Sequence, residues 1–162
     1  MGTYGYISII AMVCYAFMLL MFLAAKRNKI VNSFLVVLTG LLLWTGGSAF
    51  MRAQLWPQYE FWYQVSLFGI LLLPYAYYRF ILAFGGVREG MVGKLYLAVI
   101  LTCLVANIWN GFFLACPELV EKNGTPTFVY DIKPTILVLF FLVGAFLLHL
   151  FVILVHICKA NP

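Results

Sequence analysis

The chain has 162 residues, of which 65% are hydrophobic and only 9% are charged. Soluble domains are about half apolar and about a quarter charged, so this composition excludes a water-soluble globule and predicts a membrane protein. The formal net charge of +5 does not indicate a nucleic-acid binder, because the basic residues are few and lie at the ends of apolar runs.

Apolar segments long enough to cross a bilayer, which takes about 20 residues, recur along the whole chain. We expect helices at residues 6–25, 31–51, 60–84, 94–115 and 135–157. The first two are joined by the short basic stretch Lys26-Arg27-Asn28-Lys29, which predicts an antiparallel helix pair. Pro74 lies inside the third segment and should kink it, because proline removes a backbone donor. The sequence therefore predicts one transmembrane domain over 1–162, an all-α polytopic helix bundle.

The stretch from Cys116 to Lys133 is the one connection that is long enough to have structure of its own. Asn123-Gly124 is a strong two-residue turn signal, and apolar residues flank it on both sides. Pro126 should weaken the second strand, since proline cannot donate to the ladder. We expect a small β-hairpin over the helix ends, between the fourth and fifth helices.

The distribution of charge predicts how the bundle is oriented. With the N-terminus outside, the inner basic residues are Lys26, Arg27, Lys29, Arg88, Lys94 and Lys159, against the single acid Glu89. The outer side then carries Glu60, Glu118, Glu121 and Asp131 against Arg52, Lys122 and Lys133. Excess Lys and Arg mark the cytoplasmic side, so we expect the N-terminus and the hairpin outside and the C-terminus inside.

Polar and aromatic residues gather in the outer half of the second, third and fourth segments. The candidate ligand-binding residues are Trp44, Ser48, Trp62, Gln64, Asn107 and Asn110. They can form hydrogen bonds between helices, or they can line an outward-facing pocket for a small amphipathic ligand. Gly40, Gly46 and Gly47 in the second segment are explained by close approach of helix backbones.

Three further residues within or near the predicted spans have a simple interpretation. Arg79 is the one basic residue well within a span, and a side chain that snorkels to the interface explains it. His149 and His156 lie on one helical face, but haem ligation would need a further histidine on another helix, and the chain has only these 2. We therefore expect no metal, haem or other cofactor.

No catalytic residues are predicted, because the chain has no nucleotide-binding loop, no H-E-x-x-H and no G-x-S-x-G motif. The absence of acidic residues from the middle of the spans also argues against a proton or cation pathway. The expected protein is noncatalytic.

Three stretches are similar to the seven-helix N-terminal sensor region of some bacterial histidine kinases and diguanylate cyclases. They are Asn32 to Ser48 with its L-L-L-W-T-G-G core, Phe61 to Gly86, and Asn107 to Tyr130 with its hairpin-like loop. The resemblance implies a sensor in the bacterial cytoplasmic membrane that binds a ligand outside and drives an output domain inside. This chain departs from the family in having five predicted helices and no output domain, as in a truncated sensor or a separate five-helix relative.

We therefore expect a membrane sensor or ligand-binding module that couples an outer-side ligand to a cytoplasmic partner or a missing output domain. The alternative is a small accessory subunit of a larger membrane complex that contacts lipid, quinone or haem. The expected partners are the lipid bilayer, further copies of the chain or a larger membrane assembly, and a small amphipathic ligand, with no nucleic acid.

Overall fold

The computed structural model describes residues 3–122 and 125–160 and is an all-α helix bundle with one small hairpin. The helices are α1 (Thr3–Leu23), α2 (Lys29–Arg52), α3 (Tyr59–Phe84), α4 (Met91–Asn110) and α5 (Ile136–Ala160). The strands β1 (Glu118–Lys122) and β2 (Thr125–Val129) lie between α4 and α5. All 5 helices are long and apolar enough to cross a membrane, which confirms the predicted polytopic bundle.

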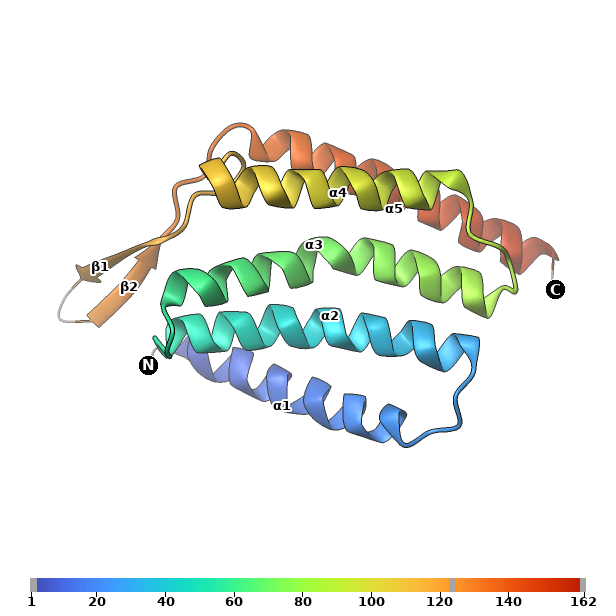
Figure 1. Ribbon diagram of the computed structural model, residues 1–162, viewed down its shortest axis with the longest axis horizontal. Helices are drawn as coiled ribbons and strands as arrows, with labels where there is room; N and C mark the ends of the chain where they lie inside the picture. The colour runs from blue at the N-terminus through green and yellow to red at the C-terminus, as the bar shows by residue number, and fades with distance from the viewer. Residues whose placement is uncertain (1–2, 123–124, 161–162) are drawn as a thin grey trace.

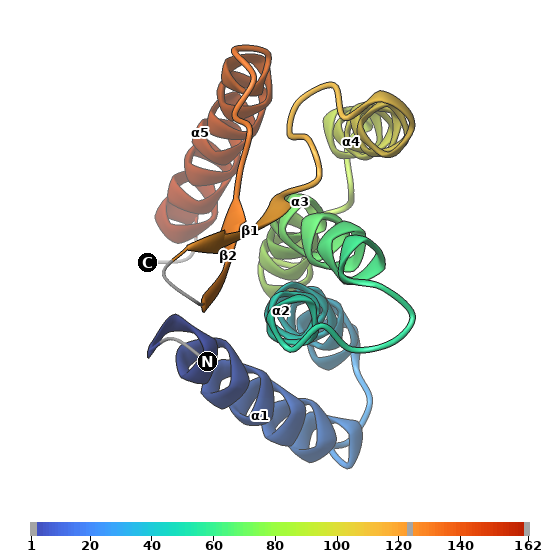
Figure 2. The ribbon, with the colours of Figure 1, turned by 90° about the vertical axis from the view of Figure 1, so that its left-hand side faces the viewer.

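The connections divide the bundle into two ends. The N-terminus, the α2–α3 connection and the hairpin lie together at one end, here called the hairpin end (Figure 1). The α1–α2 connection, the α3–α4 connection and the C-terminus lie at the other, the C-terminal end (Figure 1). Viewed from the hairpin end, α2 and α3 lie in the middle, with α1 on one side and α4 and α5 on the other (Figure 2).

Burial follows this arrangement. In the apolar windows of the spans, 44% of α2 and 39% of α3 are buried, against 0% of α1 and 11% of α5. Side chains such as Phe17 and Phe141, which are 63% and 81% exposed, can be covered only by lipid or by another protein. The two central helices therefore hold the bundle, and the outer helices present apolar faces to their surroundings.

Glycines bring α2 and α3 into backbone contact. A Cβ added at Gly47 would lie 2.6 Å from the backbone N of Ser66, and one added at Gly69 would lie 2.5 Å from the backbone N of Trp44. Ser66 Oγ donates a hydrogen bond to the Trp44 carbonyl at 3.0 Å. The predicted close approach through small residues is confirmed for Gly47, while Gly46 lies beside Met12 of α1.

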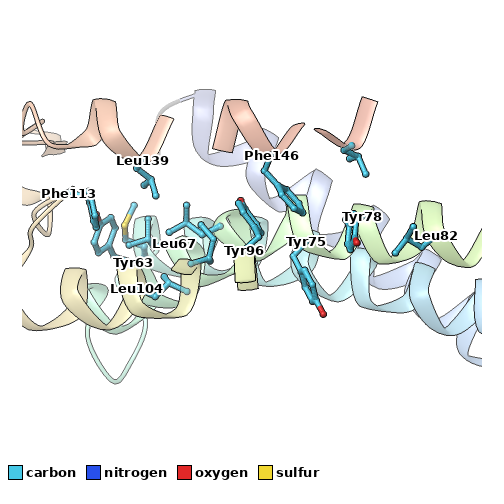
Figure 3. Packing of buried hydrophobic residues seen from close by; sticks show 14 residues of the cluster. Tyr63, Leu67, Tyr75, Tyr78, Leu82, Tyr96, Leu104, Phe113, Leu139 and Phe146 are labelled. Carbon is cyan, nitrogen blue, oxygen red and sulfur yellow. The ribbon is translucent and has the colours of Figure 1, made fainter. Parts of the chain in front are cut away.

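A row of aromatic and leucine side chains fills the space between α3, α4 and α5. It runs along the bundle from Phe113 and Tyr63 near the hairpin end to Leu82 near the C-terminal end (Figure 3). At its centre, Phe146 of α5 stacks on Tyr96 of α4 with ring centroids 3.6 Å apart. α5 is therefore attached to the bundle through side chains, whereas α2 and α3 meet at their backbones.

The largest difference from the expected boundaries is at the end of the fourth helix. α4 ends at Asn110, five residues before the predicted 115, because Gly111 takes the left-handed conformation with φ 53° and stops the helix. α3 continues through Pro74 and bends near its middle, in line with the kink predicted at this proline (Figure 1).

The predicted hairpin is confirmed: β1 and β2 pair antiparallel, with Leu119 opposite Phe128. Pro126 lies within β2, opposite Glu121. The predicted turn residues Asn123 and Gly124 lie outside the described residues.

Candidate ligand-binding site

Asn107, in the last turn of α4, is only 2% exposed and organises the chain that follows the helix. Its Oδ1 accepts hydrogen bonds from the backbone N–H groups of Phe113 at 3.0 Å and Leu114 at 2.9 Å. Its Nδ2 donates to the Leu114 carbonyl at 3.2 Å. The amide thus folds residues 111–114 back over the end of α4.

Side chains from two other elements fix the same loop. From α3, the Tyr63 hydroxyl donates to the Leu114 carbonyl at 3.1 Å. Ahead of α5, Lys133 Nζ donates to the Gly111 carbonyl at 2.8 Å, and Thr135 Oγ1 donates to the Phe112 carbonyl. The loop 111–114 therefore joins α3, α4 and α5 at the hairpin end.

A cavity of ≈ 260 Å³ lies beneath this loop, and we call it the Asn107 cavity. Its lining residues come from α3, α4, the loop and the first turns of α5: Leu67, Ile70, Leu71, Asn107, Phe113, Leu114, Ile136, Leu139, Phe140 and Val143. The wall is apolar except for Asn107, whose amide oxygen and nitrogen already bond to the loop. Such a cavity selects small apolar or amphipathic molecules by size and shape.

Trp62, which was predicted for the same pocket as Asn107, lies elsewhere. Its Nε1 donates to the carbonyls of Leu55 at 3.2 Å and Trp56 at 3.3 Å, which holds the α2–α3 connection. Its ring packs edge-on against Phe50 at 4.7 Å. Trp62 lines a separate apolar groove of ≈ 500 Å³ between α1, α2 and α3.

The other four predicted residues do not line the Asn107 cavity either. Trp44 and Ser48 lie on α2, and Trp44 contributes its backbone carbonyl to the contact with α3. Gln64 is half-buried on α3, and its Oε1 has no hydrogen-bond partner within the described part of the chain. Asn110 is exposed. The structure therefore brings Asn107 alone, of the six, to this cavity.

The apolar residues of the wall were not predicted. Leu67, Leu71 and Leu139 lie on transmembrane helices like the leucines of the core. Helical periodicity therefore does not distinguish a leucine that lines a cavity from one that packs in the core. The sequence signal nearest to the site was Asn107 followed by Gly111, a buried amide one turn before a helix-ending glycine.

Cys116 and Tyr130 at the hairpin end both have pKa values above their ordinary ones. Burial raises the pKa of the Cys116 thiol to about 11, and the nearby Glu60 carboxylate adds to this effect. Burial likewise raises the pKa of Tyr130, although Arg52 opposes the shift. Neither group provides an ionised nucleophile near pH 7.

Within residues 3–122 and 125–160, no group of three or more His, Cys, Asp or Glu side chains could hold a metal ion. His149 is half-buried, with its ring centroid 6.4 Å from that of Phe146, and His156 is exposed. Neither lines the Asn107 cavity.

Comparison with known proteins identifies the family. The family described as the N-terminal 7TM region of histidine kinase matches residues 7–162. The chain belongs to this family. The resemblance to the sensor region of histidine kinases is thus confirmed. No curated protein and no solved structure matches the chain.

Membership of the 7TM family explains the architecture. In histidine kinases this region is a noncatalytic input domain, and this member is a multi-pass membrane sensor module. The 5 candidate spans among the described residues lie between Tyr6 and Lys159, so they are distributed over the whole matched region. The Asn107 cavity lies between the last three of them.

Proposed function

We propose that this chain binds a small apolar or amphipathic molecule in the Asn107 cavity and passes the change through α5 to a cytoplasmic partner or output domain. The observation that carries the proposal is the cavity itself, which lies between α3, α4 and α5 and takes part of its wall from α5. Of the six residues predicted from the sequence, Asn107 is the one that we propose shapes this site, because it holds the loop 111–114 in place.

The proposed ligand comes from the extracytoplasmic side of a bacterial cytoplasmic membrane. Basic residues support this orientation, because Lys26, Arg27, Lys29, Arg88, Lys94 and Lys159 all belong to the C-terminal end. At the hairpin end, Trp56 and Trp109 are 88% and 84% exposed, as expected of rings that anchor a bundle at the headgroups. With this orientation the cavity lies in the outer half of the membrane.

Coupling to the cytoplasm requires an element that reaches from the cavity to the opposite end. α5 does so, because Leu139 and Val143 line the cavity while Ile157, near the other end of the helix, packs on Gly85 at the end of α3. A ligand shifts the bundle only if it binds one packing of α5 better than another. The side-chain attachment of α5 makes it the helix that can adopt two such packings.

Photolabelling with octanol that carries a diazirine group tests this site in the protein reconstituted into phosphatidylcholine bilayers. We expect saturable labelling of Phe113, Leu139 or Val143, because the cavity holds few molecules. Lipid-facing positions such as Phe141, which is 81% exposed, should instead be labelled in proportion to the octanol concentration. Mass spectrometry of the digested protein locates the label.

The matched variants are Val143→Phe, which fills the cavity, and Val138→Phe, which makes the same change at a 65% exposed position on α5. Saturable labelling should disappear in Val143→Phe and persist in Val138→Phe. If the labelling of Val143→Phe matches that of the wild type, the Asn107 cavity is not the binding site.

A further inference from the structure

A second cavity, of ≈ 400 Å³, lies at the C-terminal end of the bundle. It is formed by the start of α2, the last turns of α3 and the α3–α4 connection, and we call it the Lys29–Arg79 cavity. Its polar lining consists of Lys29, Arg79, Asn32, Ser33 and Glu89. It shares no lining residue with the Asn107 cavity and has no part in the proposed sensing function.

The charges of this wall favour an anion. Lys29 and Arg79 contribute two cations against the single carboxylate of Glu89. The Tyr75 hydroxyl donates a hydrogen bond to Glu89 Oε1 at 2.8 Å, which holds the carboxylate in place but leaves its negative charge, so the wall keeps a net positive charge. Arg79 is exposed and therefore available to a ligand.

The first turn of α2 adds to the same wall. Asn28 caps the helix by accepting a hydrogen bond from the backbone N of Val31 at 2.7 Å, and Asn32 and Ser33 follow directly. Arg27 Nη1 donates to Asn32 Oδ1 at 3.4 Å, which brings a further guanidinium to a lining residue. The positive end of the α2 dipole strengthens the preference for a negative ligand.

The remaining lining residues are apolar, which indicates that the anionic group belongs to a molecule that also has an apolar part. They are Val36, Leu82, Ala83 and Val87. Arg79 lies on α3 five residues before Phe84, or about 7 Å below the helix end at the usual rise per residue. The mouth of the cavity at Lys29 is therefore near headgroup depth, and Val36, seven residues further along α2, lies deeper, toward the acyl chains.

We propose that the Lys29–Arg79 cavity binds the phosphate group of an anionic phospholipid, with an acyl chain along Val36. Both a lipid headgroup and free inorganic phosphate carry the group that the basic residues would bind. The apolar part of the lining favours the lipid, because a free anion has no use for apolar contacts. Basic pockets between transmembrane helices recognise lipid phosphates by the same combination of charge and apolar surface.

A titration of the protein in mild detergent tests the proposal. Phosphatidylglycerol, phosphatidylcholine and inorganic phosphate are added separately, and the thermal unfolding midpoint is followed by circular dichroism. We expect saturable stabilisation by phosphatidylglycerol alone. Arg79→Gln and Lys29→Gln should each weaken its apparent affinity by about tenfold or more, because each removes a charge-assisted hydrogen bond.

The control variants keep the same end of the bundle but lie outside the cavity lining. Lys94→Gln and Lys159→Gln should bind phosphatidylglycerol as the wild type does. Glu89→Gln changes a lining residue and should bind it more tightly, because a repulsive charge is lost. Equal loss in Lys94→Gln, or unchanged affinity in both Arg79→Gln and Lys29→Gln, would overturn the site. Equal stabilisation by phosphatidylcholine or by inorganic phosphate would overturn the anionic lipid as its ligand.

Discussion

At the scale of single residues, Asn107 and Asn110 show how far polar residues in an apolar helix predict a binding site. Both were predicted either to line a pocket or to form hydrogen bonds between helices. Asn107 instead bonds to the backbone of the loop after its own helix, and Asn110 is exposed. Asn107 is buried and Asn110 is exposed because of the way the chain turns at Gly111. The spacing of the two asparagines does not predict this turn.

Replacing Asn107 with Ala leaves the backbone N–H groups of Phe113 and Leu114 without their acceptor. Each buried unsatisfied donor costs about 1–3 kcal/mol, and the bond to Phe113 is buried while the bond to Leu114 is only partly buried. We therefore expect Asn107→Ala to destabilise the fold by about 2–4 kcal/mol. Asn110→Ala is the matched control and should change stability by less than about 0.5 kcal/mol. Unfolding followed by circular dichroism in mild detergent makes the comparison, and equal losses in the two variants would refute the role of Asn107.

At the scale of helices, hydropathy was enough to place every span, because about 20 apolar residues are needed wherever a helix crosses a bilayer. The ends of the helices were predicted less accurately. α4 was predicted to 115 but ends at Asn110, because Gly111 takes the left-handed conformation and stops the helix although apolar residues follow it. The glycines of α2 predicted a close contact but not its partner. Gly47 and Gly46 are neighbours in sequence, yet they face different helices.

Gly69 provides a test of the backbone contact between α2 and α3. A Cβ there would meet the backbone N of Trp44 at 2.5 Å, and backbone cannot move aside as a side chain can. We expect Gly69→Ala to destabilise the bundle by about 1–3 kcal/mol, the usual effect of overpacking. Gly144→Ala on α5, where nothing lies within 4 Å of the new Cβ, should be neutral or slightly stabilising. Similar melting temperatures for the two variants would exclude the tight α2–α3 contact.

At the scale of the whole molecule, the number of helices, the hairpin and the family could all be anticipated from hydropathy, turn signals and residue patterns. The two cavities could not, because each is formed by residues from several elements. Lys29 and Arg79 are far apart in sequence and meet only when α2 and α3 pack side by side. A cavity forms in a helix bundle where side chains from neighbouring helices do not fill the space between them. The periodicity of the sequence does not predict where this happens.

The predicted orientation of the molecule has a direct test. In a variant without native cysteines, Trp56→Cys places a thiol at the hairpin end and Arg88→Cys places one at the C-terminal end. A membrane-impermeant maleimide should label Trp56→Cys in intact bacterial cells and Arg88→Cys only after permeabilisation, because excess basic charge stays inside. The reverse pattern would mean that the hairpin end is cytoplasmic.

The central claim is that filling the Asn107 cavity moves α5 relative to α3. Spin labels on the native Cys158, near the end of α5, and on Arg88→Cys, with the other three cysteines replaced by alanine, report this separation by pulsed electron resonance in lipid nanodiscs. We predict that octanol shifts the distance distribution of the wild type and that Val143→Phe produces a similar shift without octanol, whereas Val138→Phe does not. Identical distributions in all of these samples would contradict the account.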